Sequence, residues 1–161
     1  MADPTDEHRQ NLLQFVERFA ALLEEAGFSR MSARVFAFVL AEDADRYTAA
    51  DLAQGLNVSR AAVSGAVRPL VQSGFLVKER EPGRRAEVYR LSDDDVWSAV
   101  TQAGFANIER WLTTLEHGIA LVGPQTQGGQ RLRQSQAFFA FMDEEMPRLL
   151  ERWEKRKQSL Q

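Results

Sequence analysis

The chain has 161 residues, a net charge of −3 and a hydrophobic content of 44%, which is enough apolar material for one folded core. Because it contains no cysteine, disulfides, thiolate zinc sites and cysteine-based redox sensing are excluded. No segment approaches the run of about 20 apolar residues that a membrane span needs, and residues 1–10 are polar. We therefore expect a soluble, cytoplasmic protein without a membrane partner.

The N-terminal part of the chain predicts two helices. Asp3 and Pro4 mark the start of the first helix and Gly27 marks its end, because proline favours a first helical turn and glycine favours a helix end. Apolar residues recur at helical spacing between them. Ser32 is expected to cap the second helix.

The next segment, residues 48–73, predicts a helix-turn-helix. Thr48 can cap a short helix, and Asp51 lies three residues later, where it completes a capping box. Asn57 lies at the turn, which requires a residue that tolerates positive φ. Ser59 then caps a second helix.

This second helix is predicted to have two distinct faces. The apolar face follows a spacing of three and four residues and consists of Val63, Ala66, Val67 and Leu70. The opposite face carries Arg60, Ser64 and Arg68, with Ala61 and Gly65 beside them. A slim, cationic face of this kind fits a DNA major groove, where arginine contacts guanine edges or phosphates. A solvated surface helix is the alternative that this stripe alone leaves open.

Two strands, residues 75–77 and 86–91, are predicted to form a hairpin whose turn contains Pro82 and Gly83. A helix-turn-helix followed by a hairpin defines a winged helix, in which wing arginines reach the minor groove or its phosphates. Double-stranded DNA is therefore the expected partner. The residues expected to form the DNA-binding surface are Thr48, Ser59, Arg60, Ala61, Ser64, Arg68, Arg84 and Arg85.

The distribution of charge favours the same conclusion. Residues 59–90 contain seven basic and three acidic side chains, a net of +4, so the rest of the chain carries −7. A basic surface on an acidic body concentrates the attraction for nucleic acid on one face.

The C-terminal part of the chain predicts long helices. Ser92 and Asp95 should start one helix whose apolar stripe runs from Trp97 to Leu115. Residues 123–129 are expected to form a loop, and a final helix should follow. These helices have more apolar surface than a winged helix alone requires, so we expect them to form a core shared by two protomers. An intramolecular cap on a monomer is the alternative.

The predicted fold is therefore mainly α with a small β-hairpin wing. A winged helix-turn-helix domain, residues 29–92, is expected between an N-terminal dimerisation helix, residues 1–28, and C-terminal dimerisation helices, residues 93–161. Four aromatic residues, together with Phe139 and Phe141, could line a pocket for a hydrophobic or cationic effector: Trp97, Phe105, Trp111 and Phe138. The competing interpretation is that these aromatic side chains are simply core.

Catalysis has little support in the sequence. The two histidines, His8 and His117, do not occur at metal-ligand spacing, and no phosphate-binding glycine loop or nucleophile motif is present. The acidic run at residues 93–95 suits a helix N-terminus. We therefore expect no enzymatic activity, no metal and no cofactor.

Five segments together resemble the MarR superfamily, most closely its GbsR-like branch: residues 29–40, 47–53, 58–64, 74–77 and 82–85. The resemblance implies a dimeric bacterial transcription regulator, often a repressor, whose DNA binding is modulated by a small molecule. Asn57 departs from the glycine more common at this turn. Since fold does not fix function, a winged-helix protein-interaction or architectural module without a specific operator is the alternative.

Overall fold

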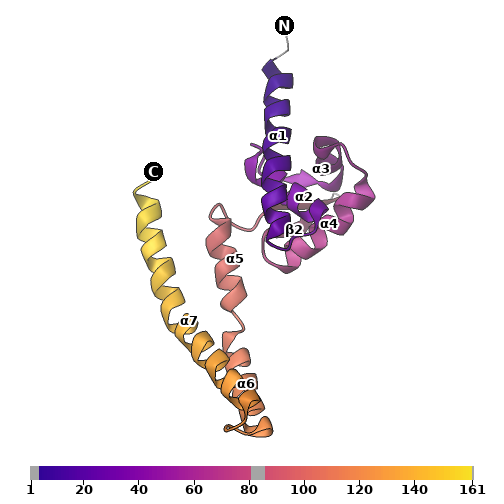
Figure 1. The fold of residues 1–161 in the computed structure, drawn as a ribbon. Helices are drawn as coiled ribbons and strands as arrows, with labels where there is room; N and C mark the ends of the chain where they lie inside the picture. The colour runs from indigo at the N-terminus through magenta and orange to yellow at the C-terminus, as the bar shows by residue number, and fades with distance from the viewer. Residues whose placement is uncertain (1–3, 81–85, 161) are drawn as a thin grey trace. The chain divides into compact units, whose positions relative to one another are not determined.

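A computed structural model describes residues 4–80 and 86–160 (Figure 1). Most described residues are helical, and three short strands form one sheet, which confirms the predicted fold class. The elements in chain order are α1 (Pro4–Glu25), α2 (Arg30–Ala41), β1 (Tyr47–Thr48), α3 (Ala49–Leu56), α4 (Arg60–Gln72), β2 (Leu76–Arg80), β3 (Glu87–Leu91), α5 (Val96–Phe105), α6 (Ile108–Val122) and α7 (Gln127–Gln158).

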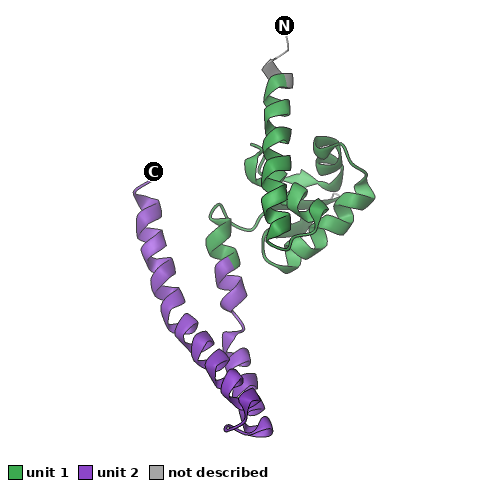
Figure 2. Ribbon diagram, viewed as in Figure 1, with its two compact units in different colours: residues 1–100 green, residues 101–161 purple. Residues whose placement is uncertain are grey.

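The chain divides into two compact units, residues 1–100 and 101–161 (Figure 2). The first unit contains α1 to α4, the sheet and the first half of α5. The second contains the rest of α5 together with α6 and α7. Because α1 packs against α2, it belongs to the same compact body as the helix-turn-helix. The dimerisation roles expected for residues 1–28 and 93–161 stay predictions.

The core of the first unit joins the helices to the sheet. Its largest fully buried side chains include Phe36 of α2, Leu56 of α3 and Leu76 of β2. The ring of Phe36 lies 4.8 Å from that of Phe75 and 5.7 Å from that of Trp97, both in edge-on contacts. The apolar stripe predicted for α4 is fully buried, as expected, so α4 is fixed on this core by one face.

The sheet contains a strand that the sequence alone does not predict. β1 has only two residues and pairs antiparallel with β3, with Tyr47 opposite Tyr89, so the strand order is β1-β3-β2. β2 is also longer than expected and extends to Arg80. A two-residue strand has no periodicity of its own, and it forms because β3 supplies its hydrogen-bonding partners.

The predicted cap of α2 was wrong. Ser29, not Ser32, is the N-cap, and its hydroxyl accepts a hydrogen bond from the Ser32 backbone N–H at 3.3 Å. Ser32 itself is buried, and its hydroxyl donates to the Ala66 carbonyl oxygen of α4 at 3.0 Å. The Ser32 hydroxyl therefore links α2 to α4 instead of starting a helix.

The predicted long helix after residue 95 is two helices. α5 ends at Phe105 and α6 begins at Ile108, with Asn107 at the N-cap of α6. The apolar stripe continues across this break, so helical periodicity did not reveal it. Asn107 occupies the N-cap position without a side-chain capping hydrogen bond.

The loop predicted at residues 123–129 is shorter than expected, because α7 already begins at Gln127. Thr126 caps α7 and accepts a hydrogen bond from the Gly129 N–H at 3.0 Å. A Cβ atom at Gly129 would lie 2.1 Å from the Gly123 carbonyl oxygen, so only glycine fits this turn. α6 and α7 pack against each other within the second unit.

The described residues contain neither a membrane-spanning helix nor a metal site. None of the described helices is both long and apolar enough to cross a membrane. Likewise, within residues 4–80 and 86–160, no three histidine, aspartate or glutamate side chains gather where they could hold a metal ion.

Candidate nucleic-acid interface

The start of α3 is fixed by the predicted capping box. The Asp51 carboxylate accepts a hydrogen bond from the Thr48 N–H at 2.7 Å, and the Thr48 hydroxyl accepts one from the Asp51 N–H at 3.2 Å. The hydrogen bonds from the Thr48 backbone and side chain lower the pKa of Asp51, which keeps its carboxylate ionised.

The turn between α3 and α4 also has the predicted conformation. Asn57 adopts a left-handed backbone with φ of 52°, and its N–H donates to the carbonyls of Ala53 and Gln54. Ser59 then caps α4, because its hydroxyl accepts a hydrogen bond from the Ala62 N–H at 3.1 Å. Both residues predicted to shape this turn are confirmed in that role.

Two arginines hold the C-terminal end of α3. Arg9 of α1 donates to the Gln54 carbonyl oxygen at 3.0 Å. Arg34 of α2 donates to the Leu56 carbonyl oxygen at 3.4 Å and pairs with Glu17 of α1 at 2.7 Å. Cations are favoured at the C-terminal end of a helix, and these two attach the turn before α4 to α1 and α2.

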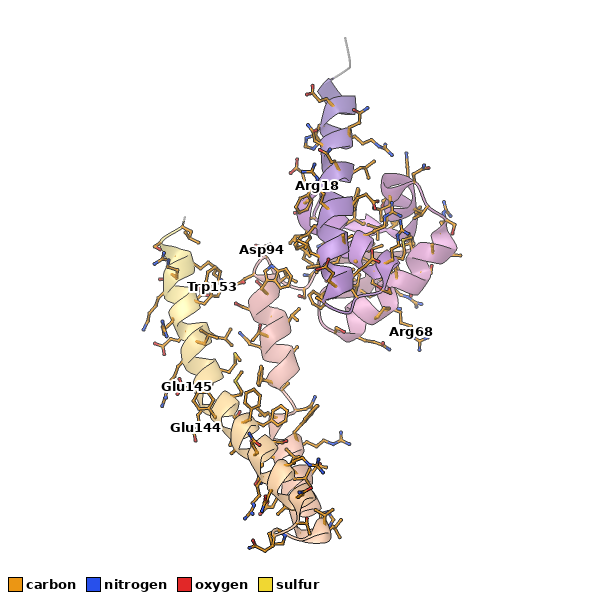
Figure 3. All side chains as sticks on the ribbon, in the orientation of Figure 1. Arg18, Arg68, Asp94, Glu144, Glu145 and Trp153 are labelled. Atoms are coloured by element: carbon orange, nitrogen blue, oxygen red, sulfur yellow. The ribbon has the colours of Figure 1, made fainter. Side chains whose placement is uncertain are left out.

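The outer face of α4 is exposed along its whole length. Arg60, Ala61, Ser64, Gly65 and Arg68 are all solvent-exposed, as the sequence predicted. Arg68 extends outward from the helix (Figure 3). Among the described residues, neither Arg60 nor Arg68 has an ion-pair partner. Both guanidinium groups are therefore available to an anionic partner.

Pro69 lies inside α4, directly after Arg68. Because proline has no N–H, it cannot donate to the Gly65 carbonyl oxygen. The helix nevertheless continues to Gln72, and Ser73 closes it by donating to the Pro69 carbonyl oxygen at 3.0 Å. Arg60 lies a full two turns before Pro69 and is for this reason the better candidate for base contacts.

The sheet carries cations on the side next to α4. Arg80 is opposite Glu87 and Lys78 is opposite Tyr89 in the β2–β3 register, so these four side chains share one face. Two grooves of about 340 and 370 Å³ separate this face from α4, and Ser64, Glu87 and Tyr89 line both of them. Each groove is also lined by one arginine of α4 and one cation of β2. These are Arg68 and Lys78 in the first groove, and Arg60 and Arg80 in the second.

Lys78, Arg80 and Glu87 were not among the site residues predicted from the sequence. The signal that would have found them is the two-residue alternation of a strand, which places them on one face once the hairpin register is known.

Thr48, which the sequence predicted for the DNA-binding surface, lines the second groove. Arg84 and Arg85, predicted for the tip of the wing, lie outside the described residues.

The opposite face of the hairpin has a different character. There Glu79 pairs with Arg90 at 2.7 Å, and this interaction lowers the pKa of the Glu79 carboxyl. Arg90 also borders a groove whose acidic side chains come from residues 42–45, directly after α2, and from residues 93–94. This face is therefore unsuited to an anionic partner.

The four aromatic residues predicted to line an effector pocket fall into two groups. Trp97 is in the first unit, where its ring packs edge-on against Phe36 and Phe75. Phe105, Trp111 and Phe138 are in the second unit. There the rings of Trp111 and Phe138 both contact that of Phe139, at 5.1 and 5.6 Å. The effector pocket itself stays a prediction.

Comparisons with known proteins match both parts of the chain. Residues 26–86 match a family model described as MarR family, and residues 95–156 match one described as MmpR5-like MarR family transcriptional regulator. A curated relative, the HTH-type transcriptional regulator MmpR5 of Mycobacterium tuberculosis, is 24% identical over 147 residues, which cover 91% of this chain and 88% of the relative. A solved structure described as a transcriptional regulator is 23% identical, with a TM-score of 0.78, over 90% of this chain and 99% of that one. This likeness to a solved structure supports the fold described above.

Proposed function

We infer that the chain is a winged-helix transcriptional regulator of the MarR family, whose models match residues 26–86 and 95–156. On that premise we propose that it binds a pseudo-palindromic operator as a homodimer and acts as a ligand-responsive repressor. Members of this family are regulators and not enzymes, in agreement with the sequence-based expectation. We further propose that it acts on bacterial DNA in the cytoplasm. Its placement in the GbsR-like branch stays a prediction.

The exposed face of α4 is the observation that carries this proposal. One side of the helix is buried in the core, and the other presents Arg60, Ser64 and Arg68 without bulky neighbours. A helix of this width enters a major groove, where arginine donates to guanine and serine bonds either bases or phosphates. Lys78 and Arg80 lie beside it on the sheet and would face the sugar-phosphate backbone.

Exposed apolar side chains support the homodimer. α6 and α7 leave large hydrophobic residues in solvent, including Trp111 at 56%, Phe138 at 57% and Leu121 at 75% exposure. Phe15 and Leu22 of α1 are similarly exposed. Soluble monomers rarely leave so much apolar surface uncovered, and a second copy would bury it. Two copies would also present two α4 helices to paired half-sites.

A small hydrophobic or cationic effector is proposed on the exposed aromatic residues of the second unit, Trp111 and Phe138. Indole and phenyl rings bind both apolar groups and quaternary cations. Because adjacent half-sites are about 34 Å apart, a shift of a few ångströms between the two α4 helices would weaken simultaneous docking. Ligand binding that moves the protomers would therefore change DNA affinity.

The central test is fluorescence anisotropy with genomic duplexes selected by the protein itself and with scrambled duplexes of equal length. Arg60→Ala should weaken binding to the selected duplex by about 1 to 3 kcal/mol, since a good base contact contributes that much. Arg18→Ala removes the same charge from the exposed side of α1 (Figure 3) and should have little effect. Equal affinity of the wild type for selected and scrambled duplexes would instead favour an architectural module.

A further inference from the structure

Glu87 is an acidic side chain on the cationic side of the sheet. Its Oε1 atom lies 2.9 Å from Lys78 Nζ and 3.8 Å from Arg80 Nη2. Its Oε2 atom accepts a hydrogen bond from the Tyr89 hydroxyl at 3.2 Å. One carboxylate thus contacts both of the cations that β2 places next to α4.

The surroundings of Glu87 keep it negatively charged. The hydrogen bond from Lys78, followed by that from Tyr89, lowers the pKa of the Glu87 carboxyl. The same carboxylate lines both grooves beside α4, next to Ser64. A fixed negative charge therefore occupies the surface to which DNA binding would bring phosphates.

We propose that Glu87 is a specificity-determining residue, which holds Lys78 and Arg80 in the free protein and thereby weakens binding to DNA of arbitrary sequence. This inference rests on the proposed DNA-binding function. A phosphate must compete with the Glu87 carboxylate for each of the two cations, so these cations add little to a complex that is held by charge alone.

The effect should differ between operator and other DNA. Non-specific binding depends almost entirely on contacts between cations and phosphates, so two restrained cations reduce it directly. In the operator complex, base contacts made by α4 fix the position of the duplex, whereas a duplex of arbitrary sequence can shift to the position with the most phosphate contacts. Cations released from Glu87 should therefore raise non-specific affinity by a larger factor than operator affinity.

The chain offers a matched control for this charge. Glu79 lies on the same hairpin and pairs with Arg90, but on the opposite face. Glu87→Gln and Glu79→Gln produce the same net charge and each release a cation. Only Glu87→Gln releases cations beside α4. The probes are a selected genomic duplex and a scrambled duplex of equal length, measured by anisotropy over a KCl series.

Glu87→Gln should bind the scrambled duplex about three- to tenfold more tightly than the wild type, with a salt slope steeper by about one to two units, one for each additional phosphate that a released cation neutralises. The increase in affinity for the selected duplex should be smaller. Glu79→Gln should match the wild type on both duplexes. Equal increases on the two duplexes, or identical behaviour of the two variants, would overturn the proposal.

Lys78→Met provides an independent test if Glu87→Gln folds poorly. Because Glu87 already pairs with Lys78, this variant should lose less scrambled-duplex affinity than Arg68→Ala, which removes the same charge from a side chain with no ion-pair partner among the described residues. An equal or larger loss in Lys78→Met would contradict the proposed restraint. If the wild type bound no duplex at all, the proposed function would fail first, and that outcome is distinct from failure of the Glu87 inference.

Discussion

Gly55 sets how closely α3 approaches α2, and its replacement by alanine gives a sharp test of the architecture that supports α4. A Cβ atom at Gly55 would lie 2.4 Å from Cζ and 2.9 Å from Cε2 of Phe38. Carbon atoms in favourable contact are about 3.5 to 4.0 Å apart, so the ring would have to move by more than about 1 Å. Phe38 is buried and packs edge-on against Tyr47 at 5.9 Å, which leaves the ring little room to move.

Overpacking of this kind costs about 1 to 3 kcal/mol, against a benefit of at most about 1 kcal/mol from the higher helix propensity of alanine. Gly65 of α4 is the matched control, because a Cβ atom there would meet nothing within 4 Å. In urea unfolding followed by circular dichroism at equal protein concentration, Gly65→Ala should match or exceed wild-type stability, and Gly55→Ala should fall below it. A Gly55→Ala protein as stable as Gly65→Ala would refute the close packing of α3 on α2.

The α6–α7 turn, the arginines proposed to contact DNA and the capping box each allow a further test. Gly129→Ala should lower the melting temperature because its Cβ would meet the Gly123 carbonyl, whereas Gly128→Ala, with only ordinary contacts, should not. Arg68→Ala should weaken operator binding. Arg84→Ala should lower the slope of log affinity against log salt concentration by about one unit. Unchanged binding in both variants would contradict the proposed docking on DNA. Folding lowers the pKa of Asp51, so its contribution to stability is complete above the ordinary value of 3.8 and disappears as pH falls through the lower folded value. In Asp51→Asn, the free energy of unfolding should therefore fall less steeply with decreasing pH in the acidic range than in the wild type. An unchanged pH dependence would show that the Asp51 carboxylate does not contribute to it.

Local sequence signals were sufficient to predict the helix-turn-helix. The capping box at Thr48, the left-handed residue Asn57 and the cap at Ser59 each act within three or four residues, so their sequence spacing already defines their hydrogen bonds. The buried stripe of α4 followed from helical periodicity for the same reason.

Features that depend on distant partners could not be predicted in this way. β1 exists because β3, some 40 residues later, pairs with it. Ser32 resembled a cap, but its hydroxyl bonds to Ala66 across the core. The break between α5 and α6 was missed because the apolar stripe continues through it, and the start of α7 was missed because the glycines at 128–129 are typical of loops.

The net charge of a segment does not show which of its cations have ion-pair partners. The net of +4 over residues 59–90 treats all cations alike, yet Lys78 and Arg80 contact Glu87, and Arg90 contacts Glu79. Among the described residues, the cations of this segment that have no ion-pair partner are Arg60 and Arg68, both on the exposed face of α4. Uncompensated charge attracts phosphates most strongly, so a duplex approaching the protein would meet it first at α4. Pairing of Lys78, Arg80 and Arg90 therefore concentrates the attraction on α4, the helix that we propose distinguishes sequences.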